Sequence, residues 1–137
     1  MKTYELSLEA SLENLSSVMA FIEEHLEAAD CPMKAMMQIT VSAEEIYVNI
    51  AHYAYPSGTG NATVRMEISE EPSALTLTFI DGGIPFDPLA KPDPDITLSA
   101  EERSIGGLGI YMTKKAMDDV RYAYKDGQNV LTLYKRF

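Results

Sequence analysis

The stretch AEEIYVNIAHYAYP, residues 43–56, places three polar side chains that could do chemistry along one edge of an apolar helical pattern. Glu45 and Asn49 are four residues apart, and His52 follows three residues later. At about 100° per residue, side chains at these spacings lie on one side of a helix. A carboxylate there can accept a proton, and an amide oxygen can bind a hard cation. A polar flank facing water explains the same spacing, so both interpretations stay open for this segment alone.

The segment IDGGIPFDP, residues 80–88, ends a predicted strand with a carboxylate. Asp81 is in phase with Phe79, so it lies on the apolar side of that strand, where a carboxylate needs a polar partner. Gly82 and Gly83 would let the backbone approach a planar ligand closely. An ordinary turn after the strand accounts for the same residues.

A third segment, IGGLGI at residues 105–110, places glycines where a helix is expected to begin. Free backbone N–H groups at a helix N-terminus bind anions, because the unpaired donors and the positive end of the dipole point the same way. The spacing does not match the Walker-type G-x-x-x-x-G-K-[ST] loop, and no strand directly precedes it as in dinucleotide folds. The segment fits a phosphate site or a flexible hinge.

The elements that must position these segments follow from the spacing of apolar residues. Strands come in adjacent pairs and do not alternate strictly with helices, which indicates an α+β fold. We expect a two-layer α/β sandwich with a mostly antiparallel mixed sheet and three helices on one face. The predicted strands cover residues 3–10, 62–69, 74–81 and both sides of an Asp126-Gly127 turn, and the predicted helices cover 12–26, 32–53 and 107–119.

Composition and charge are typical of one soluble globular domain spanning residues 1–137, with 46% apolar and 23% charged residues. The net charge of −10 argues against non-specific binding to nucleic acid or to an anionic membrane, since both need a basic patch. The single cysteine, Cys31, excludes an intrachain disulfide. No apolar run has the length of a signal peptide core or a membrane span, so a cytoplasmic location is expected.

As a set, EEIYVNIAHYAYP, DGGIPFDP and GGLGI resemble the N-box and the two glycine boxes of the Bergerat-type ATP-binding fold. Gyrase-like ATPases, histidine kinases and bacterial anti-sigma-factor serine kinases share this fold. The resemblance covers nearly the entire chain, and DGGIPFDP is particularly similar to the small stand-alone branch of anti-sigma kinases. It implies an ATP- and Mg²⁺-dependent protein serine/threonine kinase that acts as an anti-sigma regulatory factor.

The resemblance also implies a role for each motif residue. Asn49 would hold Mg²⁺ against the phosphates, and Glu45 would be the general base for the attacking hydroxyl. Asp81 would receive the adenine amino group, with Gly83 admitting the ring. Residues 88–105 would form the ATP lid. The backbone N–H groups that would bind the phosphates belong to Gly106, Gly107, Leu108 and Gly109.

The partners that the resemblance implies are a sigma factor and a small anti-sigma antagonist, which the kinase would phosphorylate on serine or threonine. A homodimer is implied as well. Two positions depart from the branch pattern. Members often carry His four residues after the N-box Asn, where this chain has Tyr53 and places His52 one residue earlier. Some relatives carry Arg where this chain has Ile105, with Arg103 nearby.

Two alternatives stay open beside the kinase. One is a non-catalytic ATP-binding module that regulates a partner protein, because the departures bear on phosphoryl transfer more than on nucleotide binding. The other is the catalytic domain of a histidine kinase, which needs a phospho-accepting His on a dimerisation helix. The chain has only His25 and His52 and no preceding helical hairpin, which argues against it.

Overall fold

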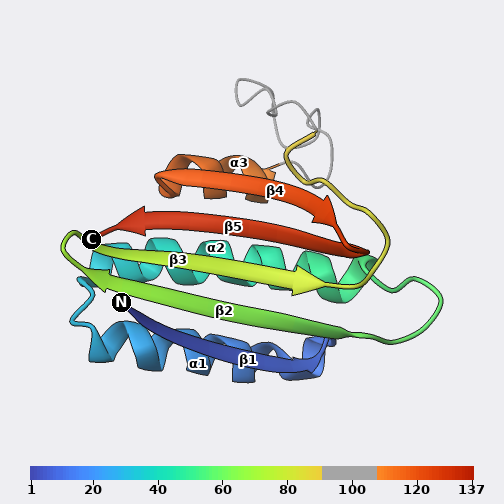
Figure 1. The fold of residues 1–137 in the computed structure, drawn as a ribbon, viewed down its shortest axis with the longest axis horizontal. Coiled ribbons are helices and arrows are strands. Elements are labelled where there is room, and N and C mark those ends of the chain that lie inside the picture. Colours follow the sequence, from blue (N-terminus) through green and yellow to red (C-terminus); the bar gives the residue numbers. More distant parts are fainter. Residues whose placement is uncertain (91–107) are drawn as a thin grey trace.

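A single sheet forms one layer of the fold. The computed structural model describes residues 1–90 and 108–137, and in this part of the chain five strands join in the order β1-β2-β3-β5-β4 (Figure 1). Each strand runs antiparallel to its neighbours. The strands are β1 (Lys2–Glu9), β2 (Asn61–Glu70), β3 (Ser73–Asp81), β4 (Asp119–Lys125) and β5 (Gln128–Arg136).

The helices form the other layer. Figure 1 shows them together behind the sheet, with α1 at the level of β1, α2 behind the sheet centre and α3 behind β4. The predicted two-layer α+β sandwich is therefore confirmed, and the described strands are antiparallel throughout. None of the described helices is long and apolar enough to span a bilayer. Their bounds are Leu15–Ala28 for α1, preceded by a 3-10 turn η1 at Leu12–Asn14, Met33–Tyr53 for α2 and Leu108–Ala116 for α3.

The core lies between these layers because apolar side chains recur with the period of each element. Every second residue of β2 is buried, among them Val64 and Met66, which face the helices. Ile39, Ala43 and Ile46 bury one side of α2 at helical spacing, as predicted. This burial holds α2 on the sheet and so fixes the neighbouring polar edge of the helix, which carries Glu45 and Asn49, in space.

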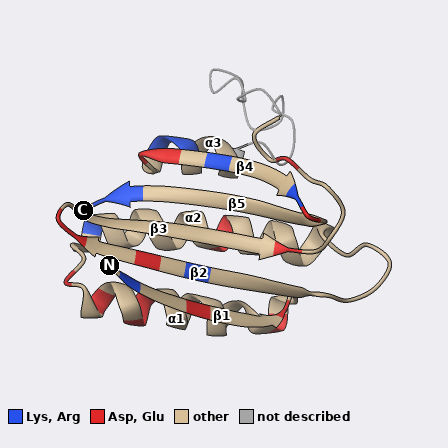
Figure 2. Ribbon diagram, in the orientation of Figure 1, with Lys and Arg blue, Asp and Glu red and all other residues tan. Residues whose placement is uncertain are grey.

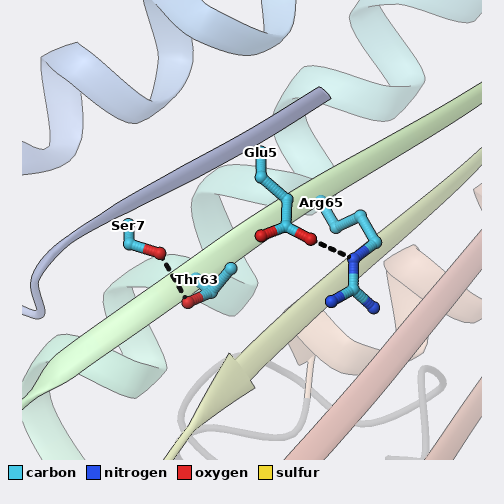
Figure 3. Close-up of polar contacts among 4 residues, drawn as sticks. All are labelled: Glu5, Ser7, Thr63 and Arg65. Atoms are coloured by element: carbon cyan, nitrogen blue, oxygen red, sulfur yellow. Dashed lines mark hydrogen bonds and ion pairs between the residues drawn. The ribbon is translucent and has the colours of Figure 1, made fainter. Parts of the chain in front are cut away.

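The other face of the sheet is polar. Arg65 Nε lies 2.7 Å from Glu5 Oε2, and the hydroxyl oxygens of Ser7 and Thr63 are 2.8 Å apart, each pair in directly opposite positions of β1 and β2 (Figure 3). Exposed cross-strand pairs of this kind contribute about 0.2–1 kcal/mol each. The sheet therefore buries one face against the helices and leaves the other to solvent.

The C-terminal hairpin follows the prediction, whereas the helix before it is shorter than predicted. Asp126 and Gly127 have φ of 54° and 76°, the left-handed values that a two-residue turn between β4 and β5 requires. The predicted helix over residues 107–119 ends at Ala116 instead. Its last residues join the sheet, because Asp118 donates its N–H to the carbonyl oxygen of Tyr134 at 2.9 Å.

Candidate functional site

The polar edge of α2 brings two of its three predicted side chains together. Asn49 Nδ2 donates a hydrogen bond of 3.4 Å to Glu45 Oε1, and both side chains are half-buried. Within the described residues, the side-chain oxygen of Asn49 accepts no hydrogen bond. His52 is exposed on the same helix, with its ring 5.9 Å from that of Tyr53. The carboxylate and the amide therefore form a pair, and the imidazole lies outside it.

Asp81 ends β3 as a buried carboxylate, with only 5% of the residue exposed. Its Oδ1 accepts hydrogen bonds from the Gly83 N–H and from Asn129 Nδ2, each at 2.9 Å. In the described part of the chain no hydrogen bond reaches Oδ2. A buried carboxylate with one oxygen fixed by two donors can offer the other to a donor on a ligand.

Asn49 and Asp81 face the same pocket between α2 and the sheet. Apolar side chains form most of its wall, which is typical of sites for small organic molecules. The cavity volume is about 40 Å³. Its lining consists of Ile46, Asn49, Ile50, Tyr53, Ala54, Phe79, Asp81, Ile84, Phe86, Pro88, Tyr122, Asn129 and Leu131.

Gly83 joins the segment after β3 to the end of α2. A Cβ at this position would lie 2.2 Å from the carbonyl oxygen of Ala54, so only glycine fits. The next residue, Ile84, donates its N–H to that same oxygen at 2.9 Å. The missing side chain therefore lets the Asp81 segment pack directly on the helix that carries Asn49.

Gly109 brings the third motif, at the start of α3, next to Glu45 on α2. A Cβ on this residue of α3 would lie 2.2 Å from Glu45 Cδ, so the carboxylate packs against the glycine backbone. Leu108 begins α3, whereas Gly106, Gly107, Arg103 and Ile105 lie outside the described residues. Of the predicted lid over residues 88–105, only 88–90 are described, and Pro88 lines the pocket.

A second concave surface lies on the far side of Glu45, between α2 and α3. This α2/α3 groove has a volume of about 730 Å³, and the exposed fractions of Met37, Val41 and Met112 along it are 59%, 63% and 54%. Glu45 lines the groove but not the pocket, whereas Asn49 lines the pocket but not the groove. The hydrogen-bonded pair therefore stands between two cavities.

Asn129 is a site residue that sequence reasoning missed. It lies opposite Asp81 on β5, is 6% exposed, and uses its amide fully. Nδ2 donates to Asp81 Oδ1 and, at 2.8 Å, to the carbonyl oxygen of Ile84, while Oδ1 accepts from the Phe86 N–H at 3.1 Å and from the Tyr122 hydroxyl. The available signal was its position in the strand. Asn129 is two residues before the buried Leu131 and so lies on the same, buried face of β5, where a polar side chain needs hydrogen-bond partners.

Two tyrosines support this arrangement from outside the motifs. Burial raises the pKa of the Tyr122 phenol, and the nearby Asp87 and Asp81 carboxylates act in the same direction, so it stays a donor to Asn129 at neutral pH. The Tyr55 hydroxyl accepts the Gly82 N–H at 2.8 Å and donates to the carbonyl oxygen of Asn61 at 2.6 Å. Both hold the backbone around Asp81 in place.

Comparison with known families gives one match that spans nearly the whole chain. Residues 8–135 match the family described as histidine kinase-like ATPase domain. The matched range includes all three motifs and the strand that carries Asn129.

Two curated proteins are similar in sequence. The serine/threonine-protein kinase BtrW of Bordetella bronchiseptica is 25% identical over 133 residues, which cover 96% of this chain and 92% of that protein. The serine-protein kinase RsbW of Listeria monocytogenes is 28% identical over 103 residues, covering 72% of this chain and 64% of that one.

A solved structure shares the fold. The crystal structure of the RsbU and RsbW domains of Rv1364c from Mycobacterium tuberculosis superposes with a TM-score of 0.69 at 16% identity. The match covers 99% of this chain and 32% of that larger one. At this identity the likeness supports the architecture, and the residue roles depend on the geometry above.

Proposed function

Because the chain belongs to the histidine kinase-like ATPase domain family, we propose that it is an ATP- and Mg²⁺-dependent protein serine/threonine kinase. The named relatives that are similar over most of the chain are protein kinases of this specificity. Phosphoryl transfer needs positioned phosphates, a group that orients or deprotonates the acceptor, and few other side chains. Among the described residues, Asn49 and Asp81 line a pocket for the nucleotide, and Glu45 is a carboxylate that could deprotonate the acceptor.

The observation that carries the proposal is the position of the Glu45–Asn49 pair between the two cavities. A kinase must bring a nucleotide and an acceptor hydroxyl to one point from two directions. Asp81 and Asn49 line the pocket, which suits the nucleotide, and Glu45 opens on the α2/α3 groove, which suits the acceptor. A site that only stored nucleotide would not need a carboxylate facing away from it.

In the proposed reaction the acceptor hydroxyl gives its proton to the Glu45 carboxylate as its oxygen bonds to the terminal phosphorus. The bond from that phosphorus to the ADP oxygen breaks, and ADP leaves with the electron pair. Glu45 is held for this step by the Asn49 amide and by contact with Gly109. The resemblance gives the backbone N–H groups of Gly106, Gly107, Leu108 and Gly109 as the donors to the phosphates.

The described residues fit a magnesium ion held mainly by its nucleotide. Among them, no three His, Cys, Asp or Glu side chains gather into a protein-only metal site. Mg²⁺ bound to a nucleotide keeps several waters and takes one or two protein oxygens beside the phosphates. The side-chain oxygen of Asn49 would be such a ligand, since its amide nitrogen already bonds to Glu45. Bound there, the ion would neutralise charge that develops on the phosphates.

The proposed partners follow from the resemblance. We propose that the kinase binds a sigma factor and phosphorylates a small antagonist protein on serine or threonine. Acidic residues are spread over the molecule, including α1, while α3 carries Lys114 and Lys115 in its last turn (Figure 2). Lys115 also lines the α2/α3 groove. The groove proposed for the phosphate acceptor therefore contains a positive charge, although the protein as a whole has a net charge of −10.

A phosphorylation assay tests the function directly. The purified chain is incubated with Mg-ATP and each candidate antagonist from its own genome, and mass spectrometry records the addition of one phosphate. Glu45→Gln should bind ATP with nearly the wild-type Kd yet transfer no phosphate, because the amide cannot accept the proton. The matched control is Glu24→Gln, an exposed carboxylate on α1 that lines neither cavity, which should transfer normally. Tight ATP binding with no modified partner for the wild type would instead establish the non-catalytic module.

A further inference from the structure

The α2/α3 groove runs between two helices of opposite direction (Figure 1). Gly109, near the start of α3, packs against Glu45 and marks one end of the groove. Because α3 then runs back along α2, Lys115 lies toward the other end, beside earlier residues of α2. The six residues from Gly109 to Lys115 correspond to about 9 Å along the axis of α3. The groove therefore extends roughly two helical turns from the carboxylate proposed as the general base.

Exposed apolar side chains line the groove between these two ends. Val41 lies four residues before Glu45 on α2. Met112 lies three residues after Gly109 on α3, so both apolar side chains are about one turn from the carboxylate. More than half of each residue's surface is exposed. Apolar side chains that gather on a surface are typical of sites where another protein binds, and the flexible methionine side chain adapts to its partner.

The two ends of the groove carry opposite charges. Glu44 and Glu45 both line the groove at one end, and Lys115 contributes a positive charge toward the other. Lys115 is exposed, and its Nζ lies 5.5 Å from the centre of the Tyr111 ring, a cation–π contact within α3. An acidic side chain on a bound protein is repelled at the first end and attracted at the second. The charges therefore set the direction in which a segment binds.

The dimensions of the groove match a helical segment of the acceptor protein. A helix that lies in a groove between two helices presents side chains at intervals of three or four residues, about 5–6 Å apart. When its hydroxyl is at Glu45, the side chain one turn away lies at Val41 and Met112. The side chain two turns away lies at Lys115, because that position is about 9 Å from the carboxylate end.

We propose that the α2/α3 groove selects its acceptor protein by binding an amphipathic helix with three features in a row. These are the phosphorylated Ser or Thr, an apolar residue three or four positions away, and an Asp or Glu six to eight positions away on the same side. The acidic residue pairs with Lys115, which is then a specificity-determining residue. This proposal rests on the proposed function and defines the chemistry of the segment that the kinase modifies.

Steady-state kinetics test the apolar contact. The probe is the antagonist protein that the wild type phosphorylates in the assay above. Val41→Asp should raise the KM for this probe about tenfold or more, because a charge replaces an apolar contact at the centre of the interface. The kcat and the Kd for Mg-ATP should stay within about twofold, since Val41 does not line the nucleotide pocket. The matched control, Met33→Asp, adds the same charge at an exposed position of α2 outside the groove and should keep the wild-type KM.

A charge exchange tests the role of Lys115. Lys115→Glu should raise the KM for the probe about threefold or more, because an exposed ion pair is replaced by two like charges. Reversal of the probe's acidic residue to lysine should weaken its use by the wild type and restore it for Lys115→Glu. A merely structural role of Lys115 would not give this rescue. Lys125→Glu, an exposed change on β4 outside the groove, should behave as the wild type does.

The outcomes separate this inference from the proposed function. If the wild type phosphorylates the probe while Val41→Asp and Met33→Asp share one KM, the acceptor does not bind in the groove and the inference is wrong. Tandem mass spectrometry locates the phosphorylated residue, and a site with no acidic residue six to eight positions away would also overturn it. So would a charge reversal that fails to rescue Lys115→Glu. A wild type that modifies no candidate antagonist would overturn the proposed function and, with it, this extension.

Hydrogen exchange gives an independent reading that does not depend on turnover. Saturating probe should slow amide exchange in peptides that cover residues 37–45 of α2 and 109–116 of α3, because the bound helix excludes water from both. Circular dichroism of every variant would show that the fold is retained. Unchanged exchange in both segments at saturating probe would place the acceptor elsewhere and reject the proposal.

Discussion

Asn129 donates a 2.9 Å hydrogen bond to Asp81 Oδ1 from the directly opposite position on β5. The pair joins two strands whose residues are far apart in sequence, and the remaining bonds of the same amide reach Ile84, Phe86 and Tyr122. One buried side chain therefore sets both the orientation of a carboxylate and the path of the backbone that follows it.

Replacing Asn129 with an apolar residue of similar size should destabilise the fold. Asn129→Leu leaves Phe86 N–H and the Tyr122 hydroxyl without their acceptor, and each unsatisfied buried group costs about 1–3 kcal/mol. We expect a loss of about 2–4 kcal/mol in the free energy of unfolding, measured by urea titration. The control Asn61→Leu, at the exposed start of β2, should change it by less than about 0.5 kcal/mol. Equal stability of the two variants would show that the amide network contributes little.

Asp81→Asn should change which base is bound. Asp81 Oδ2 is the oxygen proposed to accept the adenine amino group, and an amide nitrogen in its place would face that amino group donor to donor. ATP affinity should fall about tenfold or more, while GTP, whose ring carries a carbonyl there, should lose less. Titrations of both nucleotides measure the ratio, with Asp87→Asn as the exposed control. Undiminished preference for ATP would reject the assignment of Asp81.

Asn49→Ala should uncouple nucleotide binding from magnesium. The wild type should bind ATP more weakly when EDTA removes the metal, because Asn49 would supply the protein oxygen to the ion. In the variant, the Kd for ATP should be the same with and without Mg²⁺. His52→Ala, an exposed change one turn along α2, should keep the wild-type dependence. If the alanine variant responds to EDTA as the wild type does, the ion is held by other groups.

Gly109→Ala should redirect the Glu45 carboxylate. The added methyl would lie 2.2 Å from Glu45 Cδ, and the flexible carboxylate can move away, so stability should change by less than about 1 kcal/mol. Phosphate transfer should be lost because Glu45 no longer faces the acceptor. Gly58→Ala, with open space around its added methyl, serves as the control.

A double variant tests whether the effect of Gly109→Ala passes through Glu45. Any destabilisation by Gly109→Ala should disappear when Glu45→Ala has already removed the carboxylate, giving a coupling energy between the two sites. Additive effects in this cycle would mean that the methyl group disturbs α3 for a different reason.

The sequence by itself determined the features that depend on neighbours along the chain. Helical spacing placed Glu45 and Asn49 on one side of α2, and strand alternation placed Asp81 on the buried side of β3. The turn at Asp126-Gly127 could also be predicted, because a two-residue hairpin turn requires two successive residues with left-handed φ, and Asp-Gly adopts these values readily. Local geometry repeats with a fixed period, so these statements need no knowledge of distant segments.

The tertiary structure alone decided which distant groups meet. Only the pairing of β3 with β5 places Asn129 opposite Asp81, and only the packing of α3 on α2 places Gly109 against Glu45. The same packing set the end of α3 at Ala116, earlier than its sequence pattern indicated, because Asp118 bonds to the sheet. Strand order and helix packing depend on the burial of the whole core, and no spacing within one segment encodes them.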